Sequence, residues 1–536
     1  MDTLDFSNKR ISQQRPIASY ILGEPFKENI HTINLNSLYL KTSDVYQLFH
    51  HVLPLFSSLD SIFLESTSLF DCDLEIMFEF KSFLSQLRQL NLAHNLIQGR
   101  VFHQISSQTM TTMTLQKLWL DHNEIDCRGM IQITSLFPYL PNLQLLSLSS
   151  NFIRNTGFDV FSKTVSTLTN LNHVNLAKNK CSSQTFLAIL QNLPPGLLHL
   201  NVGYLVSTQD IFLLMLNFTS RVAQSLQRFT NLQTLHWNMY MDQHIVHGLG
   251  KLSHLQHFEN KKLFIYHGYF DFFPNLSQLK NISLSGIQMA CLPAILKALP
   301  DGMECVTIEH TRWNQSAKTI FHDWIQRQQT LKQLRLNFCS LRDIFFFRCC
   351  SVSMPLLEEI SFSNNLMGLS KSFAKFILSL SSFPKLKTII MRGNYIQDKN
   401  FLFLMRFLCS QHSPLSLKLV ISNGYFQKYP CFFSRENIML EALYRKFQET
   451  REYNSSLHRI VKFIQGKRIF THHMDIMCTQ KHNISMYNHH LQKLQALIHS
   501  RIGYLQWIRY INEEIVNDVH PVFFSRDMQI EILNYL

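Results

Sequence analysis

The sequence lacks the long apolar run that a membrane-spanning helix requires. No apolar stretch reaches about 18 residues, so we expect no transmembrane segment. The first twenty residues place acidic side chains before the basic ones and contain no apolar core, which argues against a secretory signal. Glycine and proline are scarce, at 16 and 15 of 536 residues, and no disordered linker is evident. These features predict a folded protein outside the membrane.

Cysteine is used without a pairing pattern. The eleven cysteines are odd in number and scattered, with only Cys349 and Cys350 adjacent, and no CxxC pair occurs. Such usage is typical of reduced thiols in a cytosolic protein. We therefore expect a cytoplasmic location, which for a bacterial chain includes delivery into a host cell.

Sequence motifs of catalysis are also missing. The GxxxxGK phosphate loop, the HExxH zinc helix and the GxSxG elbow do not occur, so we expect no enzymatic activity and no cofactor. The densest metal-like cluster comprises His473, Cys478, His482 and His489, but its spacing matches no standard zinc pattern. We interpret that cluster as polar helix faces or a loop with partly buried histidines, and we predict no metal site.

A repeated pattern is what the sequence does contain. The stretch "LRQLNLAHNLI" at residues 87–97 places apolar side chains at Leu87, Leu90, Leu92 and Ile97, with Asn95 between the last two. We number positions in a repeat from its first apolar residue, so that Leu87 is at position 0 and Asn95 at position 8. The same pattern begins again at residues 115, 143 and 171, a fixed period of 28 residues. A stacked array requires such regularity, whereas a single globular core does not.

Further copies of apolar residues at positions 0, 3 and 5 extend the array to about fifteen repeats over residues 30–424. They begin at Ile30, Leu59, Leu197, Leu232, Leu255, Leu279, Met303, Leu331, Leu357, Leu386 and near residue 415. The copy at Leu255 is poor because Asn260 stands where an apolar residue is expected. Successive spacings between 197 and 303 are 35, 23, 24 and 24 residues, so these turns cannot all carry the same outer helix. Residues 1–29 are interpreted as an N-terminal cap.

The pattern L-x-x-L-x-L-x-x-N-x-I resembles the leucine-rich repeat family, and its 28-residue period resembles the ribonuclease-inhibitor-like class. The resemblance implies an α/β solenoid with a curved parallel sheet inside and helices outside. Positions 3 and 5 would point into the core, and the position-8 asparagine would bond backbone groups at the bend. Members of the family also accept cysteine at that bend, where Cys339 stands in this sequence.

Residues 425–536 have apolar side chains at helical spacing without the repeat, which predicts an α-helical C-terminal domain or cap. Between Tyr425 and Tyr510, thirteen Lys or Arg residues face five Asp or Glu, so most of the net charge of +13 lies there. The segment either closes the apolar end of the solenoid, which we favour, or contacts an acidic partner or an anionic surface. No nucleic-acid-binding motif accompanies it, so no specific nucleic acid is expected.

The concave face is where we expect a partner protein to bind. Trp119 is the strongest candidate because Lys117 and Asp121 flank it on the same face, and exposed tryptophan is common at interface hot spots. The aromatic Phe63, taken alone, is interpreted as incidental. The full set of expected partner-binding residues is Lys117, Trp119, Asp121, His173, His199, His236, His257, Arg335, Glu359 and Arg392.

Four of these residues, His173, His199, His236 and His257, fall on successive predicted strands. One hypothesis places the first three in a file across the sheet, but the favoured interpretation is chance alignment in a chain with 25 histidines. A real file would make binding change steeply between about pH 5 and 7.

Two functions are compatible with these patterns. One is a non-enzymatic interaction module, such as a scaffold, receptor or inhibitor. The other is a bacterial effector or ubiquitin-ligase-associated adaptor that depends on residues 425–536. Ligase domains of such effectors use a cysteine followed two residues later by aspartate. Cys478 and Cys431 lack that partner, so we favour the interaction module.

Overall fold

The chain forms two compact units, Met1–Pro300 and Asp301–Leu536, in the computed structural model. We call them unit 1 and unit 2. The structure describes residues 3–7, 21, 29–79, 85–104, 112–206, 215–239, 241–261, 273–342, 345–346, 348, 354–368, 372–380, 383–394 and 418–420. The expected C-terminal domain at 425–536, including the cluster at His473, Cys478, His482 and His489, lies outside the described residues.

Unit 1 contains a parallel sheet in which each strand pairs with the next strand along the chain. Equal repeat positions face one another, as in the pairs Leu90–Leu118 and Leu118–Leu146. Its strands are β1 (Thr3–Asp5), β2 (Thr32–Asn34), β3 (Ser61–Phe63), β4 (Gln89–Asn91), β5 (Lys117–Trp119), β6 (Leu145–Ser147), β7 (His173–Asn175), β8 (His199–Asn201), β9 (Thr234–His236), β10 (His257–Asn260) and β11 (Asn281–Ser285).

Unit 2 repeats this arrangement with its own parallel strands in chain order. They are β12 (Cys305–Glu309), β13 (Gln333–Asn337), β14 (Glu359–Ser361), β15 (Thr388–Ile390) and β16 (Lys418–Val420). Every expected repeat from Ile30 to residue 415 therefore supplies one strand, which confirms the register of the sequence pattern.

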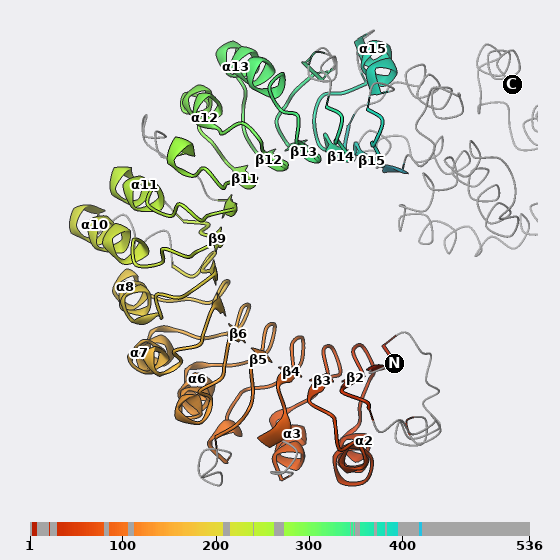
Figure 1. Ribbon diagram of the computed structural model, residues 1–536, viewed down its shortest axis with the longest axis vertical. Coiled ribbons are helices and arrows are strands. Elements are labelled where there is room, and N and C mark those ends of the chain that lie inside the picture. The colour runs from red at the N-terminus through yellow and green to blue at the C-terminus, as the bar shows by residue number, and fades with distance from the viewer. Residues whose placement is uncertain are drawn as a thin grey trace, which may run out of the picture. The chain divides into compact units, whose positions relative to one another are not determined.

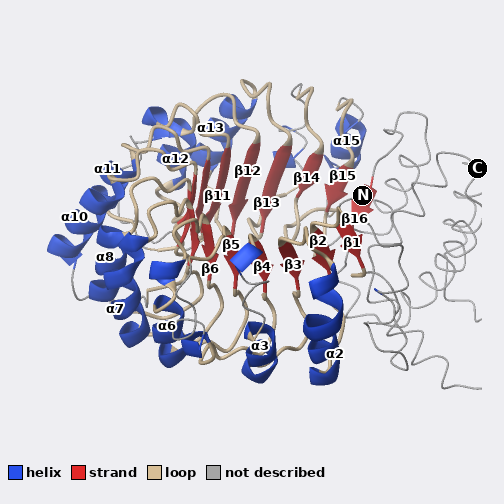
Figure 2. Cartoon of the chain, turned by 60° about the horizontal axis from the view of Figure 1, so that its bottom comes forward, coloured by secondary structure: helices blue, strands red, loops and turns tan. Residues whose placement is uncertain are grey.

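Helices follow most of the strands and lie on the outer side of each unit (Figure 1). Figure 2 shows the short strands side by side, with the helices set apart from them. In unit 1 the helices are α2 (Thr42–Gln47), α3 (Asp71–Phe78), α6 (Cys127–Thr134), α7 (Asn155–Thr164), α8 (Ser183–Asn192), α10 (Met215–Leu226), α11 (Gln243–Leu249) and α12 (Leu292–Ala298). Unit 2 has α13 (Gln315–Ile325) and α15 (Ser372–Ser379). The expected α/β leucine-rich repeat solenoid is confirmed.

The repeat positions explain how each strand is oriented. Leu118 and Leu120, at positions 3 and 5, are 2% and 0% exposed, whereas Lys117 and Trp119 are only half-buried. Alternate residues of a strand point to opposite faces of a sheet. Burial of the leucine face against the helices therefore leaves positions 2 and 4 on the inner face.

Asparagine at position 8 joins neighbouring repeats. Asn123 donates from Nδ2 to the carbonyl oxygen of Leu92 in the preceding repeat, at 2.9 Å, and to that of Leu120 in its own, at 3.2 Å. Its Oδ1 accepts from the backbone N–H of Ile97. The same bonds recur at Asn95, Asn151 and Asn179. Because buried backbone groups need partners, each asparagine fixes the bend between two turns of the solenoid.

Cys339 takes this place in unit 2. Its thiol lies 3.4 Å from the carbonyl oxygen of Ile308 in the preceding repeat and 3.2 Å from that of Asn337. Burial raises the pKa of the Cys339 thiol to about 12, so the sulfur stays protonated and can donate. The expected exchange of asparagine for cysteine is confirmed.

Outer elements between residues 197 and 300 are unequal, as the irregular spacing predicts. Helix α10 has 12 residues and α11 has 7, and among the described residues between β10 and β11 the outer element is a 3₁₀ turn, Phe273–Asn275. Asn260, at the expected apolar position, is fully buried and donates to the carbonyl oxygen of Met239 at 2.9 Å. A side-chain hydrogen bond thus permits a polar residue at that core position.

The sequence analysis missed strand β1. Leu4 pairs with Ile33 of β2, and Phe6 is 1% exposed, so the N-terminal segment contributes a strand of the same kind. Leu4 and Phe6 have the spacing of positions 3 and 5, and this signal was available in the sequence.

Among the helices within the described ranges, none is both long and apolar enough to cross a membrane. The same ranges contain no group of three or more His, Cys, Asp or Glu side chains placed to hold a metal ion.

Candidate functional site

The inner face of unit 1 presents three rows of side chains, at positions 2, 4 and 6 of the repeats. Row 4 carries an aromatic pair. The rings of Phe63 and Trp119 lie with centroids 6.2 Å apart and their planes tilted by 40°. Asn91 occupies the strand between them. Both rings are half-buried, and Lys117 lies on the same strand as Trp119.

We call Phe63, Lys117 and Trp119 the aromatic patch. Lys117 and Trp119 lie on one face, as the sequence predicts. Phe63, interpreted as incidental when taken alone, is in fact in ring contact with Trp119. The signal was the shared row, since Phe63 and Trp119 are both at position 4 with only one strand between them.

Asp121, the third residue expected beside Trp119, is engaged within the solenoid. Its Oδ1 accepts from the backbone N–H of Ser149 at 2.9 Å, from the hydroxyl groups of Ser147 and Ser149, and from Nδ2 of Asn175 at 3.3 Å. The carboxylate therefore links three repeats. Its demonstrable role is to hold the inner face in place.

Two of the expected histidines form a stack. His173 and His199 face each other across β7 and β8, with ring centroids 4.0 Å apart and planes 18° apart. Nδ1 of His173 lies 2.5 Å from Oδ1 of Asn172, which fixes the orientation of that ring. Stacked imidazoles at this distance disfavour simultaneous protonation.

The pKa values of the stack follow from that arrangement. Burial, followed by the nearby histidines His173, His257 and His236, lowers the pKa of His199 to about 4. Burial and the charge of Lys117 lower the pKa of His173. Both imidazoles are therefore neutral at pH 7, and the pKa of His199 lies below the window of about pH 5 to 7 expected from the sequence.

The expected file of three histidines is corrected by the register of β9. His236 faces Asn201 and Glu259, while Thr234 faces His199, so His236 belongs to row 4 and the stack to row 2. The error arose because positions 2 and 4 were treated as one row. Nδ1 of His236 instead lies 3.4 Å from Oε1 of Glu259.

Glu259 is the centre of a small charged cluster. Lys261 Nζ lies 3.3 Å from its Oε2, and Asn238 donates to its Oε1 at 3.3 Å. Burial raises the pKa of Glu259, but the hydrogen bond and charge of His236, with those of Lys261 and Asn238, outweigh it and bring the pKa to about 2. This carboxylate is ionised throughout the physiological range.

His257 lies in row 2 with the stack but is separated from His199 by Thr234. Nδ2 of Asn281, on the next strand, donates to Nδ1 of His257 at 2.6 Å. The four histidines thus comprise a stacked pair, a ring beside the Glu259 carboxylate and a ring bonded to asparagine.

The expected residues of unit 2 form a separate group. Nε of Arg335 donates to Oε1 of Glu359 at 2.7 Å, and this bond is the largest cause of the raised pKa of Arg335. Arg392 is exposed one row away. Arg335 and Glu359 therefore neutralise each other on the inner face of unit 2.

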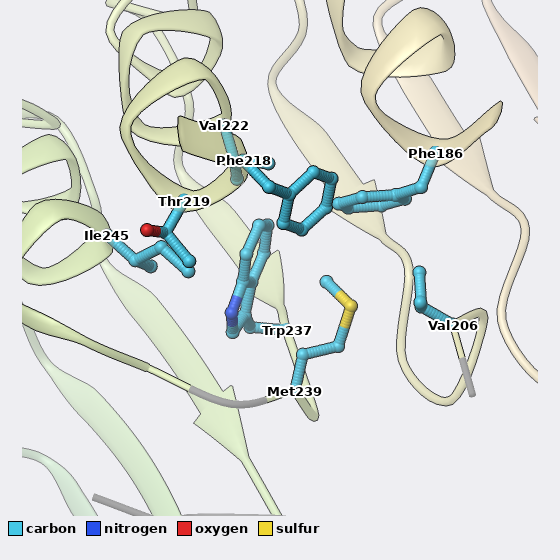
Figure 3. Close-up of a pocket in the computed structure, with 8 residues that line it drawn as sticks. All are labelled: Phe186, Val206, Phe218, Thr219, Val222, Trp237, Met239 and Ile245. Atoms are coloured by element: carbon cyan, nitrogen blue, oxygen red, sulfur yellow. The ribbon is translucent and has the colours of Figure 1, made fainter. Parts of the chain in front are cut away.

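A small cavity lies in the core between β9 and the outer helices, where Trp237 stands at position 5. Figure 3 shows Trp237 between Thr219 and Ile245 on one side and Phe186 and Met239 on the other. The cavity measures about 10 Å³, room for one water molecule at most, and the indole Nε1 has no hydrogen-bond partner. Its size and apolar lining exclude it as a substrate site.

The buried leucine rows, the parallel strands and the asparagine bonds together define a leucine-rich repeat solenoid. The sequence matches no family model and no curated protein. Solved structures with some likeness include an internalin (inlF) from Listeria monocytogenes, at 16% identity over 68% of this chain and 87% of that chain, with a TM-score of 0.38. Another is internalin C2 (inlC2) from the same species, at 17% identity over 48% and 81% of the two chains, with a TM-score of 0.28.

Proposed function

We propose that the protein is a non-enzymatic interaction module that binds a partner protein on the inner face of unit 1. The observation that carries this proposal is the aromatic patch. The ring centroids of Trp119 and Phe63 lie 6.2 Å apart on the inner face, and both rings are only half-buried. Large aromatic side chains dominate the binding energy of many protein interfaces. Held on strands, they bind with little loss of conformational freedom.

The surroundings of the patch support this role. Asp121 fixes the neighbouring strands through Ser147, Ser149 and Asn175, so the surface is formed before a partner arrives. The neutral His173–His199 stack lies farther along the same face and offers ring surface and nitrogen atoms for hydrogen bonds. A partner that spans both features would contact strands β3 to β8.

We also infer the ribonuclease-inhibitor-like class from the 28-residue strand-and-helix repeats, and a cytoplasmic location. The location is supported by thiols that form no disulfide at Cys72, Cys127, Cys305 and Cys339. The alternative function, as an effector or ubiquitin-ligase-associated adaptor, depends on residues 425–536, outside the described residues.

Site-specific photo-crosslinking tests the proposal. A benzophenone amino acid replaces Trp119 in the full chain, and a matched variant carries it at Tyr46, which is 47% exposed on the outer helix α2. Exposed to the native cytoplasm, the position-119 variant should crosslink to a discrete protein that the position-46 variant does not capture. Trp119→Ala should weaken binding of that protein by at least tenfold. Equal crosslinking at both positions, or unchanged binding by the alanine variant, would contradict the proposal.

A further inference from the structure

Each regular repeat of unit 1 turns away from its strand at position 7, where the backbone is left-handed. Four successive repeats have His94, His122, Ser150 and Lys178 there, with φ angles of 56°, 53°, 55° and 55°. Two residues later, at position 9, the same repeats carry Leu96, Glu124, Phe152 and Lys180. We call these eight residues the loop edge. It adjoins the inner face but belongs to the turns and not to the strands.

The loop edge is exposed although its backbone is fixed. Phe152 is 66% exposed and Leu96 is 37% exposed, and both lysines are exposed as well. The backbone N–H of Phe152 donates to the carbonyl oxygen of Ile125 at 2.9 Å, which holds the aromatic residue in place. The backbone N–H of Lys180 likewise donates to the carbonyl oxygen of Ile153. The apolar side chains therefore project from rigid turns.

The side chains of position 7 form a continuous surface across repeats. His94 and His122 stack with centroids 4.1 Å apart and planes 10° apart. Burial, then the charges of His94 and Lys178, lower the pKa of His122, which shows that the lysine two repeats away lies within electrostatic reach. One ligand can thus contact several turns at once.

The backbone does not require these side chains. Left-handed φ angles cost an L-residue roughly 1–2 kcal/mol, a cost that glycine avoids. Gly286 occupies position 7 of the repeat at Leu279 with φ 72°, and a Cβ there would meet no atom within 4 Å. Glycine therefore suits this turn. Other residues nevertheless occupy position 7 in the seven consecutive repeats that begin at residues 30 to 197, so the left-handed turn is general and the chemistry of its side chains distinguishes the loop edge.

The opposite edge of the sheet differs in charge. At position 1, Oδ2 of Asp60 lies 3.8 Å from Nδ1 of His31 and 3.8 Å from Nε of Arg88. The basic side chains of that edge therefore have an acidic neighbour. Around Phe152, by contrast, Lys178, Lys180 and Arg154 are exposed. The acidic residues Glu124 and Asp126 belong to the preceding repeat, where Asp126 lies 3.8 Å from Arg100. The three cations are complemented electrostatically by acidic groups on a ligand, and the apolar side chain of Phe152 lies beside them.

We propose that the loop edge of unit 1 binds an acidic protein segment that packs an apolar side chain against Phe152 and places carboxylates near Lys178 and Lys180. This surface is additional to the inner face and takes a different ligand chemistry. Burial of a large aromatic residue contributes affinity, while the lysines select for negative charge.

Selection from a phage-displayed library of random 12-residue peptides on the full chain tests this. The enriched peptides should be acidic with at least one large apolar residue. Their binding should weaken at least tenfold in Phe152→Ser and in the double variant Lys178→Glu/Lys180→Glu. Matched controls are Leu55→Ser, which removes an apolar side chain 53% exposed elsewhere in unit 1, and Lys163→Glu on the outer helix α7. Both controls should change binding less than twofold.

Several outcomes would overturn the proposal. These are failure to enrich any peptide, enrichment of basic peptides, or equal binding by wild type and Phe152→Ser. A dimer in light scattering that Phe152→Ser abolishes would identify a second copy as the occupant, and lysine-dependent binding to phosphatidylserine vesicles without peptide binding would identify a membrane. Trp119→Ala should leave peptide binding unchanged, so a failure here is distinguishable from failure of the inner-face proposal.

Discussion

Two stretches of unit 1 build the same kind of turn from different interactions. The repeats that begin at 87, 115, 143 and 171 use asparagine at position 8, with hydrogen bonds to the preceding repeat. The next repeat has Leu205 at that position, and the repeat at 279 has Ile287, which are 0% and 4% exposed. Where the asparagine is lost, apolar packing replaces the hydrogen bonds.

The irregular stretch also replaces a leucine by Trp237 at position 5. The indole meets Phe186 edge to face at 5.8 Å but leaves its Nε1 unpaired beside a cavity of about 10 Å³. An unpaired buried donor costs about 1–3 kcal/mol. The regular turns therefore add the asparagine hydrogen bonds to apolar packing, whereas the irregular turns rely on packing and leave the Trp237 Nε1 unpaired.

The largest expected effect concerns the leucine core shared by both stretches. Leu120→Asp places an unpaired carboxylate at a fully buried position, and we expect it to destabilise the fold by about 4 kcal/mol or more. Lys117→Ala, three residues earlier on the inner face, should change the free energy of unfolding by less than about 0.5 kcal/mol. Chemical denaturation measures both. Equal stability of the two variants would contradict the register assigned to the strand.

The second prediction isolates the asparagine bonds of the regular stretch. Asn151→Ala removes donors to the carbonyl oxygens of Leu120 and Leu148 and the acceptor of the Ile125 N–H, all buried. We expect a loss of roughly 2–3 kcal/mol because several buried backbone groups become unpaired. The control is Asn170→Ala, whose side chain is exposed and donates one bond, to Pro141. A loss no greater than that of the control would show that packing alone holds these turns.

The third prediction probes the irregular stretch. Trp237→Leu restores the usual residue of position 5 and removes the unpaired Nε1, but it enlarges the cavity between β9 and the outer helices. We expect a net loss of roughly 2 kcal/mol, since cavity creation in a core outweighs one lost polar defect. A gain in melting temperature would mean instead that the tryptophan itself strains the repeat.

Much of this fold follows from the sequence because each repeat restates the same physical requirements. Positions 3 and 5 must be apolar, and position 8 must bond the backbone, so four clear copies define the register for the degenerate ones. Strand β1 was missed because a single copy at Leu4 and Phe6 has no such reinforcement. The irregular spacing predicted that the outer helices differ from one another. It did not predict their bounds, since spacing alone does not specify where a helix begins.

The inner face was harder to predict than the core. Position numbers placed Lys117 and Trp119 correctly, but the contact of Trp119 with Phe63 depends on the small size of the intervening Asn91. The bonding of Asp121 and the pairing of His236 with Glu259 depend on side-chain conformations that one sequence does not reveal.

The smallest expected effect concerns the His173–His199 stack. His199 lies on β8, directly before an irregular repeat, so a measurement of its titration tests whether that repeat alters the inner face. Because the pKa of His199 falls from an ordinary 6.5 to about 4 in the folded chain, the unfolded chain binds a proton more readily between those pH values. The free energy of unfolding should therefore decrease as the pH drops from about 6.5 toward 4, and it should be independent of this group above that range. His199→Gln should flatten that part of the curve, whereas Asn170→Gln, which alters an exposed residue that does not titrate, should leave the slope unchanged.

His236→Gln tests the corrected register in the same assay. His236 lies in another row, so its removal should not relieve the contact between the stacked rings, and most of the slope should persist. Burial is the largest cause of the low pKa of His199, followed by His173, His257 and His236. If the two histidine variants flatten the curve equally, the influence of His236 exceeds that of the stacked ring, and a single file of histidines across β7, β8 and β9 would be the better description of the inner face.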